Sequence, residues 1–241
     1  MTRKIFRSLS LTLAVLASLI VLHHTALAGP PLLCHPFEIG NAKSLPWAGS
    51  EWRAVKTDYD LNRLVDETLA LLTPETPVIV RMETLRRATV YAVWAMNDAK
   101  VGYSVRDSKV ANELLSRLTA RANEAKGKGR AEALALFDLG YVIESYKQAT
   151  PMTRGLNLAN GLDGYASVIK AISLRGSDPE MEFAAAIIAS YPQRNTQREH
   201  LQKAVAGAKE GSLLARNLVS HFGDRGKTMT ELRANVGLAK N

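Results

Sequence analysis

The feature that most constrains the fold is a series of apolar residues at helical spacing, which starts near residue 58 and continues almost to the end of the chain. Proline or glycine separates the successive segments, as at Pro74, Gly127 and Gly176. Apolar residues at every third or fourth position predict amphipathic helices with one buried face. No segment shows the sustained alternation of apolar and polar residues that is typical of a strand. The sequence therefore predicts an all-α fold.

Eight helical segments are expected, at residues 58–72, 76–97, 107–125, 131–148, 163–174, 178–189, 197–208 and 212–222, followed by a short turn or helix at 230–236. Two of them open on a capping residue followed by proline, at Thr76-Pro77 and Asp178-Pro179. Because the loops between them are short, we expect antiparallel helical hairpins, arranged either as an irregular solenoid or as a bundle. Residues 57–241 are predicted to form a single helical domain.

Residues 29–56 differ from the rest of the chain. Prolines and glycines interrupt this segment at close intervals, at Pro30, Pro31, Pro36, Gly40, Pro46 and Gly49. This spacing excludes a continuous helix, so we predict an extended N-terminal arm with at most a short helical turn around residues 41–45. Phe37, Trp47 and Trp52 are expected to pin the arm to the helical body. Trp47 and Trp52 are also candidates for a binding surface, because with Trp94 they can form an aromatic platform for a ligand.

The first 28 residues are typical of a signal peptide. A positively charged head holds three basic residues, Arg3, Lys4 and Arg7. The apolar run at residues 9–22 is shorter than the roughly 20 residues that a membrane span needs. Ala26-Leu27-Ala28 matches the site that signal peptidase accepts, which predicts cleavage before Gly29 and a secreted or periplasmic protein. A retained N-terminal anchor is the alternative; after cleavage, no stable membrane insertion is expected.

The net charge falls from +8 to +5 when this segment is removed, because it holds three basic and no acidic residues. The remaining excess is spread along the chain, and the nearest approach to a cluster is Lys126-Lys128-Arg130, which we interpret as a solvated loop. A nucleic-acid partner is therefore not expected. Glu83 and Arg87 stand four residues apart, which predicts an ion pair on a helix surface.

Cys34 is the only cysteine, so an intrachain disulfide is excluded. Its neighbour His35 can in principle lower the pKa of the thiol or accept its proton. Side chains adjacent in an extended segment point in opposite directions, which argues against that pairing. Three interpretations follow: a thiol packed inertly beside Phe37 and Trp47, an intermolecular disulfide or redox partner, or a catalytic residue. Cys34 and His35 are the only catalytic candidates, and enzymatic activity is not expected.

The other histidines do not predict a metal site. His200 follows Glu199, and His221 lies three residues before Asp224, and a single histidine–carboxylate pair is not a coordination shell. We expect His221 to be a cation or a cap at the end of its helix. No metal and no cofactor are predicted.

Part of the helical region resembles tetratricopeptide repeats. The resemblance covers roughly residues 131–222 and rests on four elements, Leu139-Gly140-Tyr141 with Tyr146 and Ala149, Tyr165-Ala166-Ser167-Val168-Ile169-Lys170-Ala171, Asp178-Pro179, and Ala184-Ala185-Ala186. The first helices of successive pairs begin near residues 131, 179 and 212, which departs from a regular repeat. The resemblance implies a concave surface that binds a protein or peptide.

The sequence thus favours an exported helical scaffold that binds a protein or peptide partner without catalysis. The competing hypothesis is a thiol-dependent or redox role centred on Cys34 with His35. Self-assembly at the cell envelope is a third, structural hypothesis.

Overall fold

A computed structural model of the chain describes residues 31–96, 103–190 and 195–238. The predicted signal peptide and its cleavage site lie outside these ranges. Within them the chain is mostly helical, which confirms the all-α prediction. The helices are α2 (Pro31–Cys34), α3 (Leu64–Leu71), α4 (Val78–Val93), α5 (Lys109–Glu124), α6 (Arg130–Ala149), α7 (Gly164–Arg175), α8 (Pro179–Ile188), α9 (Gln197–Gly207), α10 (Leu213–His221) and α11 (Met229–Asn235), with short 3-10 turns at Leu61–Arg63 and Thr150–Met152.

Four helix starts follow from a capping residue that the sequence supplies. In four helices a short polar side chain accepts a hydrogen bond from a backbone N–H of the first turn; these caps are Asp163, Asp178, Ser212 and Thr228. Such caps satisfy donors that have no partner within the helix. The predicted segments at 163–174, 178–189 and 212–222 are therefore confirmed to within two residues at each end.

The prediction for residues 76–97 is wrong at its C-terminal end. Helix α4 stops at Val93, and two strands follow, β1 (Trp94–Met96) and β2 (Tyr103–Val105). They pair antiparallel, with Trp94 opposite Val105. The N–H of Arg106 donates to the carbonyl of Val93 (2.8 Å), so the end of the helix finds a partner across the hairpin. Strands of three residues are too short to produce a periodic pattern, which is why the sequence did not predict them.

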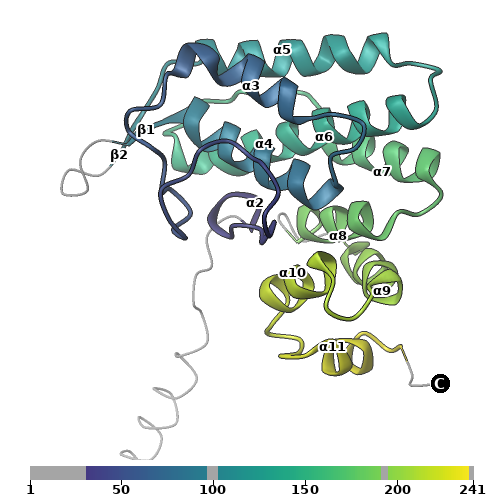
Figure 1. Ribbon diagram of the computed structural model, residues 1–241. Helices are drawn as coiled ribbons and strands as arrows, with labels where there is room; N and C mark the ends of the chain where they lie inside the picture. Colours follow the sequence, from purple (N-terminus) through teal and green to yellow (C-terminus); the bar gives the residue numbers. More distant parts are fainter. Residues whose placement is uncertain (1–30, 97–102, 191–194, 239–241) are drawn as a thin grey trace, which may run out of the picture.

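The helices form a stack that runs from α3 and α5 at one end to α11 at the other (Figure 1). Helix α6 packs most extensively against α7, and α8 against α9. Gly140 and Gly164 face each other where α6 meets α7, and a Cβ atom on Gly140 would lie 2.5 Å from the carbonyl oxygen of Gly164. The small residues of this region thus allow a close approach, while the resemblance to tetratricopeptide repeats stays a prediction. No helix in the described ranges has both the length and the hydropathy of a membrane span.

The arm is largely irregular, as expected, and it crosses the body beside α4 (Figure 1). Its first described residues form the single turn α2, for which Pro31 supplies a suitable N-terminal residue. The short helical turn allowed around residues 41–45 is absent, and the chain there makes a turn closed by the N–H of Ala42 and the carbonyl of Ile39 (3.2 Å). The arm contributes four buried side chains to the main hydrophobic core, Leu32, Leu33, Phe37 and Leu45.

Candidate functional site

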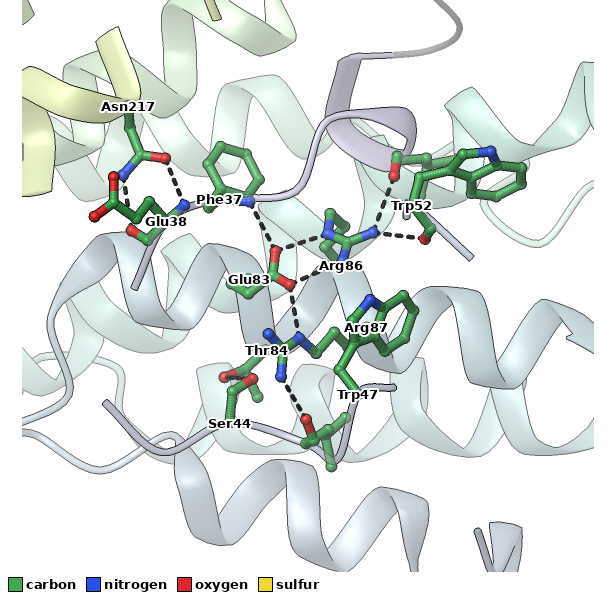
Figure 2. A network of polar contacts seen from close by, with 12 residues as sticks. Phe37, Glu38, Ser44, Trp47, Trp52, Glu83, Thr84, Arg86, Arg87 and Asn217 are labelled. Carbon is green, nitrogen blue, oxygen red and sulfur yellow. Dashed lines mark hydrogen bonds and ion pairs between the residues drawn. The ribbon is translucent and has the colours of Figure 1, made fainter. Parts of the chain in front are cut away.

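The most unusual site in the described chain is a group of buried charges on α4, formed by Glu83, Arg86 and Arg87 (Figure 2). The side chains of Glu83 and Arg86 are 0% exposed, and that of Arg87 is 16% exposed. Glu83 accepts two hydrogen bonds from Arg86, at 2.7 and 2.8 Å, and one from Nε of Arg87 at 2.6 Å. One carboxylate therefore serves two guanidinium groups.

The pKa of Glu83 reflects two opposing effects. Burial alone would raise it, because a charged carboxylate is poorly solvated in the interior. The hydrogen bonds and charges of Arg86 and Arg87 act in the opposite direction and outweigh burial, so the pKa of Glu83 is held below its ordinary value. Glu83 is consequently ionised at neutral pH.

The same three side chains fasten the arm to the body. Nη1 of Arg86 donates to the carbonyl of Leu33 (3.1 Å) and to that of Trp52 (2.9 Å). Nη1 of Arg87 donates to the carbonyl of Leu45 (2.6 Å) (Figure 2). The backbone N–H of Phe37 donates to Glu83 at 3.0 Å. Irregular backbone has no secondary-structure partners, so these bonds satisfy groups that burial would otherwise leave unpaired. We call this arrangement of Glu83, Arg86 and Arg87 the arm clamp.

The expected pairing of Glu83 with Arg87 is present, but its predicted place on a helix surface is wrong. The arm covers this face of α4, and residues that lie more than 30 positions away in the sequence leave no local pattern. One signal was present in the sequence. Helix α4 begins and ends with apolar runs, at 78–80 and 90–93. These runs indicate a buried helix, and charges within a buried helix must be paired.

Trp47 lies on the clamp. The guanidinium carbon of Arg86 is 4.8 Å from the centre of its ring, and that of Arg87 is 5.5 Å away, which are cation–π distances. Tyr91 packs edge-on against the same ring at 5.8 Å. The indole N–H donates to the carbonyl of Glu51 (3.1 Å). These contacts fix both the position and the orientation of the indole.

A pocket of about 580 Å³ opens beside this ring. Its walls are residues 42–47 of the arm, Glu67, Ala70 and Leu71 of α3, and Arg87 of α4. We call it the Trp47 pocket. Two hydrogen bonds join the arm wall to α4, one between the hydroxyls of Ser44 and Thr84 (3.0 Å) and one from the hydroxyl of Tyr91 to the carbonyl of Pro46 (2.8 Å). The pocket is therefore preformed, with a volume in the range of small-ligand and short-peptide sites.

The structure separates the two predicted binding tryptophans. Trp47 lines the pocket, whereas Trp52 packs edge-on against the buried Trp94 with ring centres 5.8 Å apart. The guanidinium of Arg53 lies 5.9 Å from the ring of Trp52. Trp52 thus anchors the arm on the core, and it is not among the residues that line the Trp47 pocket.

Cys34 and His35 are not brought together as a reactive pair. Within the described residues no hydrogen bond joins their side chains, and the ring of His35 lies 5.8 Å from that of His221. Burial raises the pKa of Cys34, and the nearby charge of Arg86 lowers it by less. A raised pKa leaves little thiolate at neutral pH, and thiolate is the reactive form. The thiol-dependent role stays a prediction, to which this geometry adds no support.

The expectation that His221 is a cation is wrong. Its ring is stacked on Phe37 at 4.6 Å and meets Phe183 edge-on at 5.4 Å. Burial lowers the pKa of His221 to about 4, so the ring is neutral at pH 7. The expected capping contact is present, since Nδ1 lies 3.0 Å from the carbonyl of Asn217 in the last turn of α10. His221 therefore acts as a packing residue between the arm and the helical body.

Two further buried polar groups join helices away from the pocket. Arg81 of α4 and Asp138 of α6 form an ion pair at 2.6 Å, with each side chain 1% exposed. Nδ1 of His200 lies 2.6 Å from Glu182, and its Nε2 lies 2.7 Å from the hydroxyl of Tyr165. Neither group borders the Trp47 pocket. No cluster of three or more potential metal ligands occurs among the residues that the structure describes.

Comparison with known proteins gives no relative: no family model, no curated protein and no solved structure matches this chain. The arm clamp and the Trp47 pocket must therefore be interpreted from their chemistry alone.

Proposed function

We propose that the protein is an exported helical scaffold that binds a peptide or protein partner in the Trp47 pocket. The observation that carries this proposal is a preformed pocket with an aromatic wall, built where an irregular arm is clamped to a helix. A site that is rigid before binding loses little conformational entropy when a ligand enters. An accessible tryptophan beside cationic side chains is also typical of the residues that dominate binding interfaces.

A pocket-filling variant tests this proposal. Ala70 is exposed on α3 and lines the pocket, so Ala70→Leu is expected to fill part of it without altering a charge. Ala120→Leu is the matched control, because Ala120 is exposed on α5 and takes no part in the pocket. Full chain produced with its own N-terminal segment is crosslinked gently in its native compartment. We expect a partner chain to be crosslinked to the wild type and to Ala120→Leu, but not to Ala70→Leu. Equal capture by both variants, or none by the wild type, would contradict the proposal.

The export part of the proposal has its own measurement. Mass spectrometry of the protein recovered outside the cytoplasm should give a chain that begins at Gly29. A protein found only in the cytoplasm with residues 1–28 attached would refute export while leaving the binding test intact.

A further inference from the structure

The arm clamp carries more positive than negative charge. Arg86 and Arg87 share the carboxylate of Glu83, and within 4 Å no other described carboxylate pairs with either guanidinium. One positive charge is therefore left in excess in a largely buried group. An uncompensated charge in such a place is costly, and an anion bound beside it would offset that cost.

The excess charge reaches the pocket through Arg87. Two of its nitrogens are occupied, Nε by Glu83 and Nη1 by the carbonyl of Leu45. Its Nη2 forms no hydrogen bond within the described residues and is not enclosed by protein, and the side chain lines the Trp47 pocket. Arg87 thus keeps one strong donor that no described group occupies, on a side chain that lines the pocket.

Of the other ionised groups of the pocket, Lys43 strengthens this preference. Lys43 is exposed on the arm wall and forms no ion pair with the described residues. Glu67 is the one acidic residue of the lining, and it is already engaged by Arg63 at 2.5 Å and by the hydroxyl of Tyr59 at 2.7 Å. The cations that remain available are therefore Arg87 and Lys43.

Most of the remaining lining of the pocket is apolar. Pro46 and Trp47 come from the arm, and Ala70 and Leu71 from α3. A ligand that contacts both the cations and the apolar lining has an anionic oxygen next to an apolar group. Arginine and lysine form short charge-assisted hydrogen bonds with carboxylates, and an indole face binds aliphatic or aromatic groups.

We infer that the Trp47 pocket binds a peptide through a carboxylate held by Arg87 and Lys43, with the adjoining apolar side chain against Trp47 and Leu71. This inference rests on the proposed function and specifies its ligand. The carboxylate comes either from the end of the partner chain or from an acidic side chain beside an apolar one.

Labelled synthetic peptides separate these sources, with fluorescence anisotropy as the readout on full-length protein. One pair ends in phenylalanine as the free acid or the amide. A second pair, blocked at both ends, carries Glu-Phe or Gln-Phe internally. We expect the carboxylate member of at least one pair to bind about tenfold more tightly than its neutral partner, with the preference weakening as salt rises. The pair that shows the preference identifies the source.

Lys43→Ala tests the assignment at the residue level. It should reduce the carboxylate preference about threefold or more, whereas Lys109→Ala, which changes an exposed lysine on α5, should leave it unchanged.

Three outcomes would contradict the inference. If the charged and neutral peptides bind equally, and Ala70→Leu abolishes the binding of both, the carboxylate inference is overturned and the proposed function stands. No binding of any peptide to the wild type would count against both. Displacement by 3-phenylpropionate at the affinity of the whole peptide would assign the pocket to small carboxylic acids and overturn the peptide inference.

Discussion

At the scale of single residues, Glu83 is the side chain on which the arm clamp depends. Glu83→Gln preserves its shape and removes the charge that Arg86 and Arg87 share. Removing one partner of a buried ion pair costs about 3–5 kcal/mol, because the remaining charge is left uncompensated. We expect the free energy of unfolding in urea to fall by about this amount.

The matched control for this variant is Glu199→Gln, which changes an exposed carboxylate that, among the described residues, forms an ion pair with Lys203 on the same helix. Its effect should stay below about 0.5 kcal/mol. Since the pKa of Glu83 is lowered in the folded protein, its stabilising contribution is present above its ordinary pKa and is lost as the pH falls through the lower folded value. Equal stability of the two variants would show that the clamp does not stabilise the fold.

Asp138 gives a pH dependence of the opposite sign. Burial raises its pKa from 3.8 to about 6, and the charge of Arg81 lowers it by less. Its contribution to stability is fully present below pH 3.8 and is lost as the pH rises through about 6. The free energy of unfolding of the wild type, relative to that of Asp138→Asn, should therefore rise by on the order of 2–3 kcal/mol as the pH falls from 7 to 4. Urea denaturation of both proteins across this range measures the difference, and a constant difference would refute the assignment.

At the scale of elements, the contact between α6 and α7 depends on two facing glycines. Gly140→Ala places a methyl group against the backbone of Gly164, so the helices must separate. Such overpacking costs about 1–3 kcal/mol. Gly49→Ala is the control, because its new methyl group would lie at an ordinary 3.7 Å from Ala54. Thermal unfolding should show a lower midpoint for Gly140→Ala only; equal midpoints would mean that the close approach is not required.

Elements with a local cause could be predicted from the sequence. The helix that begins after Asp178 needs only a cap, a proline and apolar residues at helical spacing, and all of these lie within one turn or two. The hairpin of β1 and β2 could not be predicted, because its short strands are stabilised by pairing across a loop. Local interactions thus determined most helices, and they determined the helix ends where a capping residue marks them.

The candidate site was predicted only in part. Trp47 was a predicted binding residue because, with Trp52 and Trp94, it could form an aromatic platform for a ligand. Arg86 was missed, because its partners are the carbonyls of Leu33 and Trp52, which lie far away in the sequence. The position of Arg87 in the pocket has the same non-local origin. A site built by folding an arm across a helix leaves no spacing that a motif can describe.

At the scale of the whole molecule, the arm connects helices that are far apart in the chain. Near Arg86 it is held by α4, and a few residues later the backbone of Glu38 exchanges hydrogen bonds with Asn217 of α10 at 2.8 and 2.9 Å. Phe37 stacks on His221 at the same place. The arm therefore joins α4 to α10.

Acid should weaken this connection through His221. The titratable groups that face its ring are His35, whose charge further lowers the pKa, and Glu83, whose charge raises it. Because burial lowers the pKa of His221 from 6.5 to about 4, its contribution is present above pH 6.5 and is lost as the pH falls through 4. The free energy of unfolding of the wild type, relative to that of His221→Phe, should fall by on the order of 2–3 kcal/mol between pH 6.5 and pH 4. Parallel pH profiles of the two proteins would contradict this prediction. Because protonation of Asp138 stabilises the fold over the same pH range, the comparison with His221→Phe is needed to isolate the effect of His221.

The measurement that tests the central claim most directly is the titration of full-length, nitrogen-15-labelled protein with a peptide that has a carboxylate next to phenylalanine. The three indole N–H signals are assigned by replacing each tryptophan in turn. The account predicts that the signal of Trp47 shifts in a saturable manner, while those of Trp52 and Trp94, which lie outside the pocket lining, stay in place. Saturable binding that moves Trp52 or Trp94 and leaves Trp47 unchanged would contradict it.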